Sequence, residues 1–233
     1  NIKRELDQKG RYSFSAHQFN KNGEKCLINY TYLYFNQYFG VVVVAIEDIT
    51  ELSGQDALTG GYNRQGFVQK AERVLQNSEE TDHYAILFFN IKNFKAVNEL
   101  FGIDLGDFIL REIYDDLKNS LLQPIIIARA EADHFVCLVK RETLDSDVLT
   151  RLCTKKISRS GKTIRLFSRC GIFYIEDKTM PVNMMIGRAK LAKKYITDEY
   201  VQPYKVYDSS MQTAYIDKAE IAGELAEGIA KGE

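Results

Sequence analysis

YAILFFNIKNFKAVNELFGIDLGD, which spans residues 84–107, changes its hydrophobic pattern twice. The apolar run at 84–90 is short and rich in aromatic and branched residues, which predicts a buried strand. Residues 94–101 predict a short helix, and residues 107–122 predict a longer one. The apolar side chains expected to face the core from the longer helix are Ile109, Leu110, Ile113, Leu117 and Leu121. The stretch therefore indicates a domain that mixes strands and helices.

The same alternation continues on both sides of this stretch. Apolar residues recur at helical spacing in 64–76 and again in 182–196. A polar tip between two apolar segments predicts a β-hairpin after the long helix. The further strands expected are 124–130, 135–140, 164–175 and 204–207. Together these elements predict an α+β fold, in which a sheet carries helices on its faces.

The two ends of the chain have different patterns. Residues 11–49 read as three strands of an antiparallel meander, with breaks at 20–23 and 36–37. Three strands with one apolar face are marginal alone, so we expect this meander to pack on the main domain or on a second copy. A polar connector follows at 47–55, and residues 213–230 carry the apolar stripe of a helix that needs a partner surface.

The composition excludes several classes of protein. The chain has 233 residues, 45% of them hydrophobic and 27% charged, with a formal net charge of −1. This charge balance predicts no nucleic-acid partner. The four cysteines lack zinc-site spacing and are expected to be buried free thiols. The longest apolar run, 39–46, is far shorter than the ~20 residues that span a bilayer, and no signal peptide is visible. A cytoplasmic location is expected, within a longer protein that could carry a membrane anchor.

Four motifs occur in one order over about 80 residues. They are DALTGGYNR at 56–64, NIKNFKAVNE at 90–99, FGIDLGD at 101–107 and RAEADHF at 129–135. This set resembles GGDEF domains, which make cyclic di-GMP. The resemblance covers residues 52–208 and implies the nucleotidyl-cyclase-like fold, with an antiparallel-centred sheet flanked by helices.

The flanking segments resemble two other modules of cyclic di-GMP signalling proteins. Residues 11–51 resemble the last strands of a PAS sensor domain. Residues 207–233 resemble the junction into an EAL domain, the cyclic di-GMP phosphodiesterase module. The expected organisation is therefore a PAS-like end at 1–51, a GGDEF domain at 52–208, and a linker helix at 209–233 that leads to an EAL domain outside this chain.

The resemblance implies a site at which Mg²⁺ and carboxylates join two GTP molecules, one from each of two facing domains. Asn90 stands where the family has its strand-end carboxylate. Asp133 keeps one acidic position of the hairpin tip and is the remaining candidate metal ligand, while His134 replaces the other. Lys92 adds a cation on the same strand face as Asn90. The resemblance thus indicates a degenerate site; alternatively, Asn90 is a strand-end cap and His134 an exposed tip residue.

The hairpin tip also departs from the family pattern at two glycines. They are replaced by Glu131 and Ala132, and a carboxylate at Glu131 is expected to repel phosphates. An expected product-inhibition site before the hairpin is missing, because its positions hold Leu122 and Ile125. Asp56 and Arg64 are expected to tie the opening loop together.

The positions that recognise the base are kept. By resemblance, Asn98 and Asp107 hydrogen-bond guanine, while Lys95 and Phe94 lie in the nucleotide site. Guanine has two neighbouring donors that can both bind one carboxylate, and adenine cannot offer this paired contact. Asp107 could instead cap the helix expected at 107–122. Asn98 could be a solvated helix residue and Lys95 a surface charge.

A late-helix lysine that contacts phosphates in the family corresponds to Thr197, or in another register to Lys193 or Lys194.

Three functions follow as hypotheses. The first is a catalytically impaired domain that binds GTP and regulates the attached EAL phosphodiesterase. The second is a structural relay, which binds no nucleotide and couples modules through a homodimer. The third is a residual diguanylate cyclase.

Overall fold

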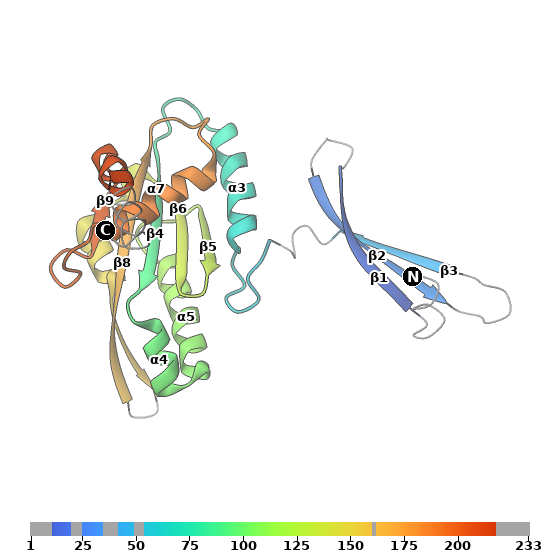
Figure 1. The fold of residues 1–233 in the computed structure, drawn as a ribbon, viewed down its shortest axis with the longest axis horizontal. Helices are drawn as coiled ribbons and strands as arrows, with labels where there is room; N and C mark the ends of the chain where they lie inside the picture. The colour runs from blue at the N-terminus through green and yellow to red at the C-terminus, as the bar shows by residue number, and fades with distance from the viewer. Residues whose placement is uncertain (1–10, 20–24, 35–41, 49–53, 160–161, 218–233) are drawn as a thin grey trace, which may run out of the picture. The chain divides into compact units, whose positions relative to one another are not determined.

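The computed structural model describes residues 11–19, 25–34, 42–48, 54–159 and 162–217. The chain divides into two compact units, Asn1–Gln55 and Asp56–Glu233 (Figure 1). Each unit has its own sheet, and the smaller one is described first.

The smaller unit is an antiparallel sheet of three strands in sequence order. It contains β1 (Arg11–Phe19), β2 (Lys25–Tyr34) and β3 (Val42–Asp48). Cross-strand pairs stabilise it: the Phe14 ring stacks on the Tyr30 ring at 5.1 Å between centroids. The predicted meander is confirmed, while its origin in a PAS domain stays a prediction.

The larger unit is built on a sheet with the strand order β5-β6-β4-β8-β7, to which β9 adds as a parallel neighbour of β8. The strands are β4 (Tyr84–Ile91), β5 (Ile126–Glu131), β6 (His134–Lys140), β7 (Thr154–Arg159), β8 (Lys162–Ile175) and β9 (Tyr204–Val206). The other pairings are antiparallel. The predicted antiparallel-centred sheet is confirmed.

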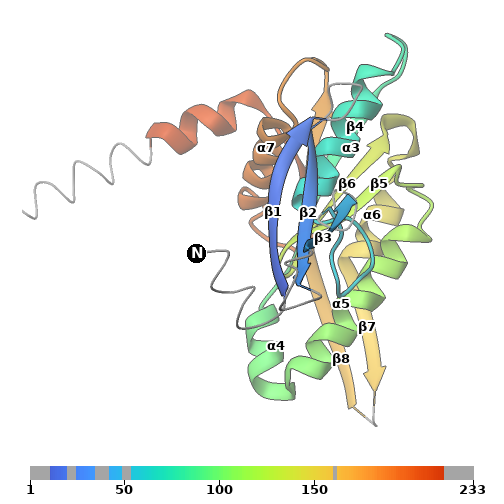
Figure 2. The same ribbon diagram turned by 90° about the vertical axis from the view of Figure 1, so that its right-hand side faces the viewer.

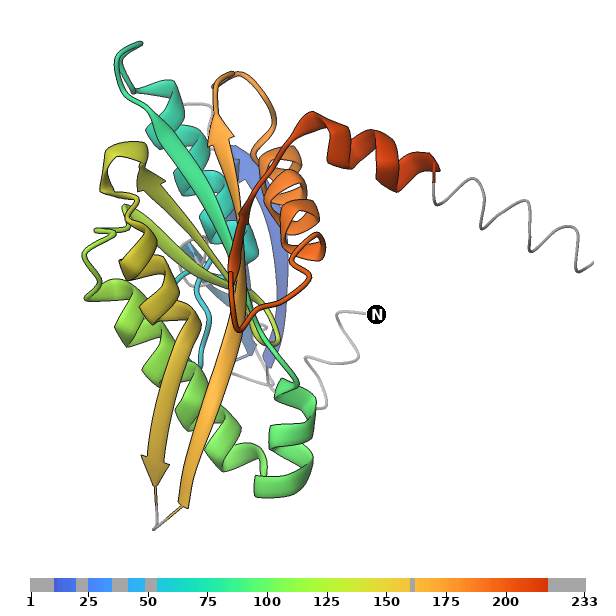
Figure 3. The same cartoon turned by 90° about the vertical axis from the view of Figure 1, so that its left-hand side faces the viewer.

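Helices cover both faces of this sheet, as the two side views show (Figures 2 and 3). They are α3 (Arg64–Gln76), α4 (Phe94–Phe101), α5 (Ile103–Lys118), α6 (Ser146–Cys153) and α7 (Val182–Lys194), with a short 3-10 turn at Arg141–Thr143. The central strand β4 is apolar on both faces because both are covered. Phe88 belongs to the core under α3 and α7, and Phe89 to the core on the α4–α6 side.

One helix, α7, lies unusually close to the sheet. A Cβ at Gly171 of β8 would overlap the carbonyl oxygen of Ala189 and lie 2.7 Å from the backbone nitrogen of Lys193. Only a glycine leaves room for this approach. It brings the last turn of α7 over the middle of β8 and close to the end of β4, where Lys193 reaches Asn90.

The long helix differs from the prediction at both ends. It begins at Ile103, four residues before Asp107, because Gly102 turns the chain with φ of 88° and α5 starts directly after it. It ends at Lys118, so Leu121 lies beyond it and is 68% exposed, not in the core as expected. Leu122 is buried in its place, at 1% exposure.

Two elements were not predicted, the short helix α6 and strand β7. The sequence of β7 is dominated by polar residues, which conceals a strand. The buried free thiols expected from the sequence are confirmed at Cys137, Cys153 and Cys170, while the Cys26 side chain lies outside the described residues.

The segment expected to form the C-terminal helix is helical at 209–217, and the rest of it lies outside the described residues. Of the helices that the structure describes, none combines the length and apolar character needed to cross a membrane.

Candidate nucleotide site

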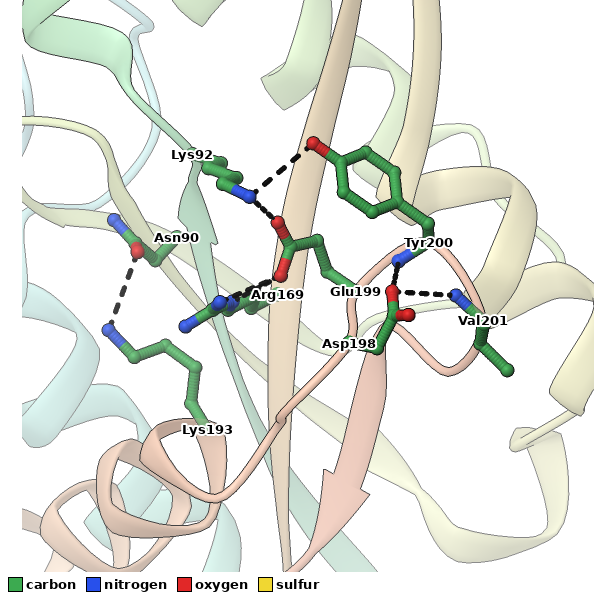
Figure 4. Close-up of polar contacts among 8 residues, drawn as sticks. All are labelled: Asn90, Lys92, Arg169, Lys193, Asp198, Glu199, Tyr200 and Val201. Atoms are coloured by element: carbon green, nitrogen blue, oxygen red, sulfur yellow. Dashed lines mark hydrogen bonds and ion pairs between the residues drawn. The ribbon is translucent and has the colours of Figure 1, made fainter.

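Asn90 stands at the end of β4, where the hairpin tip and α7 meet. Its amide nitrogen donates to Asp133 Oδ2 at 2.6 Å. Its amide oxygen accepts from Lys193 Nζ at 3.4 Å, as Figure 4 shows. These two partners fix the orientation of the amide, since only its oxygen can accept and only its nitrogen can donate. Asn90 thus does more than cap a strand: it links Asp133 to Lys193.

This arrangement does not fit a divalent cation. Mg²⁺ prefers several oxygen ligands that carry negative charge. Here the Asn90 oxygen faces an ammonium group, and Asp133 already accepts from the Asn90 amide. No group of three or more carboxylate, histidine or cysteine side chains that could hold a metal occurs among the described residues.

Lys92 does not leave an unbalanced cation in the site, as the sequence suggested. Its Nζ donates to Glu199, and Arg169 binds the other oxygen of that carboxylate at 2.7 and 3.1 Å (Figure 4). The Glu199 side chain is only 2% exposed. A buried carboxylate requires such partners. Both cations are therefore bound at the edge of the site, where the single charge of Glu199 offsets one of them.

Lys193 shares its environment with other cations. Burial lowers its pKa, and the positive charges of Lys190, Arg169 and Lys194 lower it further, whereas Asp133 acts in the opposite direction. The Nζ atoms of Lys190 and Lys193 lie 5.8 and 5.6 Å from the centroid of the Phe88 ring. The site therefore has an excess of positive charge at this corner.

His134 is not an exposed tip residue, which corrects the alternative drawn from the sequence. It is the first residue of β6, pairs with Asn90 across the strands, and has a side chain only 20% exposed. Its ring lies 5.1 Å from that of Phe88, and Nδ1 is buried without a hydrogen bond from the described residues. Burial lowers the pKa of His134.

The turn itself lies at Ala132, which has a φ of 44°. That left-handed conformation costs roughly 1–2 kcal/mol for a residue with a Cβ. The hairpin tip thus keeps a backbone conformation that favours glycine, although Ala132 stands where the family has a glycine. Glu131 is exposed and lies 4.0 Å from His134 Nδ1.

The opening loop is tied to the hairpin tip by Arg129. Arg129 binds Asp56 Oδ2 at 3.1 Å and the Ala132 carbonyl at 2.7 Å. Asp56 also accepts from the hydroxyl of Thr59 at 2.8 Å. Arg64, which was expected to join this tie, instead reaches Asn183 of α7 at 3.1 Å. The prediction was right for Asp56 and wrong for Arg64.

The expected base-recognition residues meet at the joint between α4 and α5. The Asn98 side chain lies against Gly106, where a Cβ would overlap its Oδ1 atom. That oxygen is buried and accepts no hydrogen bond from a described residue. Asp107 follows directly, and as the fifth residue of α5 it cannot be the N-cap, because the cap is Gly102. The capping alternative is therefore wrong.

Phe94 and Lys95 lie close to this joint in different ways. Phe94 is a buried core residue, and its ring end is 3.1 Å from the Cβ position of Gly106. Phe94 therefore packs against the α4–α5 joint from the core side. The Lys95 side chain is 91% exposed and lies 3.7 Å from Glu99, as a surface charge does.

Of the late-helix candidates, Lys193 is the one that reaches Asn90. Lys194 donates to the Tyr215 hydroxyl at 3.1 Å instead, and Thr197 is an exposed residue beyond α7. Glu199 and Arg169 were missed by sequence reasoning. Arg169 could have been found from strand register, since it pairs with Asn90 across β4 and β8. Glu199 sits in a polar loop that gives no such signal.

Together, the fold and these residues define the class of the protein: an α+β domain with a candidate site at one end of its central sheet. The family described as "Diguanylate cyclase, GGDEF domain" matches residues 53–193. The chain belongs to this family and hence to cyclic di-GMP signalling.

Individual relatives agree with this assignment. The chain is 28% identical over 192 residues to the bifunctional diguanylate cyclase/cyclic di-GMP phosphodiesterase MucR of Pseudomonas aeruginosa, covering 79% of this chain and 28% of that protein. It is 27% identical over 114 residues to the cyclic di-GMP phosphodiesterase PdeR of Escherichia coli, covering 46% of this chain and 17% of PdeR. The chain spans less than a third of the length of either relative.

Solved structures show the same fold. The isolated GGDEF domain of TpbB (YfiN) from Pseudomonas aeruginosa aligns with a TM-score of 0.59 at 22% identity, covering 69% of this chain and 98% of that one. The coiled-coil and GGDEF domain of DgcB from Caulobacter crescentus, in complex with c-di-GMP, aligns with a TM-score of 0.57 at 18% identity, covering 68% and 87%.

Proposed function

We propose that this GGDEF domain binds GTP as a regulatory ligand, does not make cyclic di-GMP, and regulates an EAL phosphodiesterase attached after residue 233. The observation that carries the proposal is the Asn98 oxygen, buried at the α4–α5 joint beside Asp107 and without a donor among the described residues. A buried acceptor left unpaired costs about 1–3 kcal/mol. A guanine base supplies donors to the neighbouring carboxylate, and to this oxygen once the Asn98 side chain turns toward the ligand.

The proposed lack of cyclase activity rests on the phosphate end of the site, around Asn90. Phosphoryl-type transfer depends on neutralising charge, which metal ions do in the family. Asn90 and Asp133 bind each other, and Lys193 faces the Asn90 oxygen. We therefore expect no cyclic di-GMP from GTP after overnight incubation with Mg²⁺ or Mn²⁺. Product in that assay would support the residual cyclase instead.

The proposed regulatory role is supported by the activities named for related proteins. MucR and PdeR are both named as cyclic di-GMP phosphodiesterases, and MucR as a cyclase too. A domain that binds GTP without converting it can report nucleotide supply to a neighbouring phosphodiesterase. The alternative is the structural relay, in which the same domain couples its neighbours without a ligand.

Calorimetry with GTP, ATP and guanosine separates these readings. GTP should bind more tightly than ATP. Asp107→Asn keeps the shape of the side chain but cannot accept two protons, so it should weaken GTP about tenfold or more, since a hydrogen bond to a charged group contributes about 1.5–3 kcal/mol. The matched control is Asp115→Ala, which removes an exposed carboxylate from the same helix. If neither GTP nor guanosine binds the unaltered protein, the structural relay replaces this proposal.

A further inference from the structure

Lys193 is held in place by the packing of the fold. Its backbone nitrogen lies 2.7 Å from the Cβ position that a side chain at Gly171 would have. The close approach of α7 to β8 therefore fixes the position of the Lys193 backbone. From there its half-buried side chain reaches the Asn90 oxygen at 3.4 Å (Figure 4). The lysine therefore stands at the strand end where the family pattern calls for metal-binding carboxylates.

The charges around Lys193 do not balance within the described part of the chain. Arg169 is bound to Glu199, which also holds Lys92. Lys190 and Lys193 form no ion pair with a described residue, and Asp133 is the carboxylate that acts on Lys193. Repulsion among these cations contributes to the lowered pKa of Lys193. An anion placed here would relieve that repulsion and would gain charge-assisted hydrogen bonds.

We infer that this domain binds the phosphates of a nucleoside triphosphate without a divalent cation. The ammonium groups of Lys193 and Lys190 neutralise the phosphate charge in place of Mg²⁺. The inference rests on the proposed binding of GTP and specifies the ionic form that is bound. A chelated Mg²⁺ would carry two positive charges into a corner that already holds two lysines, where Asp133 acts on Lys193 and Glu131 is exposed beside His134. Free GTP is thus preferred over the Mg²⁺ complex.

The test is calorimetry of GTP and guanosine in EDTA and in excess Mg²⁺. GTP should bind more tightly in EDTA than in excess Mg²⁺, and guanosine should bind equally in both. Lys193→Met, which keeps the length and apolar stem, should weaken GTP in EDTA by tenfold or more and leave guanosine unchanged. The matched control is Lys194→Met, because the adjacent Lys194 amine is directed to Tyr215. That variant should bind GTP as the unaltered protein does.

A second variant guards the test against misfolding. Asn90→Asp restores a carboxylate at the strand end, so it should reverse the preference and bind the Mg²⁺ complex more tightly than free GTP. GTP binding to the unaltered protein that is as tight or tighter in Mg²⁺ would overturn the inference but leave the proposed function standing. An unchanged GTP affinity in Lys193→Met would overturn it as well. If the unaltered protein binds neither guanosine nor GTP, the proposed function itself is rejected.

Discussion

The two ends of the candidate nucleotide site differ in how their polar groups are paired. At the base end, the joint of α4 and α5 leaves the Asn98 oxygen buried without a described donor. At the phosphate end, the chain supplies its own partners: Asn90 binds Asp133, and Glu199 binds two cations. One end is incomplete without a ligand and the other is largely satisfied without a metal. Under the proposed function, the comparison teaches that metal ligands can be replaced in a domain that keeps its base-recognition residues.

A glycine controls each end. Gly171 admits α7 to the sheet and thereby places Lys193, while Gly106 makes room for the Asn98 side chain. The obstacles differ: at Gly171 the crowding atoms are backbone, whereas at Gly106 the closest atom is the tip of a side chain. Backbone in a packed helix cannot move aside cheaply, but a side chain can rotate. Equivalent substitutions at the two glycines should therefore have unequal effects.

The largest effect is expected for Gly171→Ala. The new methyl group meets the Ala189 carbonyl and the Lys193 nitrogen, so α7 must shift away from β8. We expect a loss of about 3 kcal/mol in the free energy of unfolding, at the upper end of what overpacking costs. Urea titration measures it. Gly187→Ala is the control, because that glycine also lies in α7 but has no atom within 4 Å of its Cβ position. Equal stability of the two variants would contradict a tight α7 contact.

Glu199→Gln should have the next largest effect. The amide keeps the shape but cannot neutralise Lys92 and Arg169, whose side chains are 32% and 31% exposed. Because these cations retain some water, the loss should be about 2 kcal/mol, below the 3–5 kcal/mol of a fully buried pair. Glu176→Gln breaks the exposed pair with Arg141, which spans 3.1 Å, and should change stability by less than about 1 kcal/mol. Similar losses in both variants would mean that the Glu199 cluster is no more than a surface ion pair.

Gly106→Ala tests the base end. The methyl group displaces the Asn98 oxygen, so one hydrogen bond to the base is lost and a donor on guanine goes unpaired. GTP and guanosine should both weaken about tenfold, or about 1.4 kcal/mol. The gain in helix propensity should offset part of the cost to folding. Calorimetry with both ligands makes the check: a loss confined to GTP would place Gly106 at the phosphate end instead.

The sequence predicted the base end better than the phosphate end. Asn98 and Asp107 belong to motifs that lie within ten residues of each other, so local pattern sufficed to bring them together. It did not reveal that α5 begins at Ile103, because that start depends on the positive φ of Gly102. The capping alternative for Asp107 failed for this reason.

At the phosphate end, the decisive contacts join distant parts of the chain. Lys193 reaches Asn90 across 103 residues, and Glu199 reaches Lys92 across 107. No periodicity encodes such contacts, which follow from packing at Gly171 and from the path of the loop after α7. The substitutions at Asn90 and His134 were visible in the sequence, but the partners that satisfy them were not.

The smallest effect concerns His134, which belongs to the phosphate end. Burial lowers its pKa, and the cations of Lys193 and Lys190 add to this, while Asp133 and Glu131 act in the opposite direction. The folded state therefore favours the neutral ring. As pH falls below the ordinary histidine value of about 6.5, the unfolded chain takes up the proton first. Stability is therefore lost from that pH down to the lower pKa of the folded state. Above that value the contribution is fully present.

The thermal midpoint should therefore drop more between pH 7.5 and pH 5 in the unaltered protein than in His134→Gln. The difference should be small, about 2 °C or less for a domain of this size. The other histidines are present in both proteins and cancel in the comparison. Phosphates bound beside Lys193 would stabilise the charged ring, so saturating GTP in EDTA should shrink the difference while guanosine should not. A pH dependence unaffected by GTP would separate His134 from the phosphate end and confine that end to Asn90 and the two lysines.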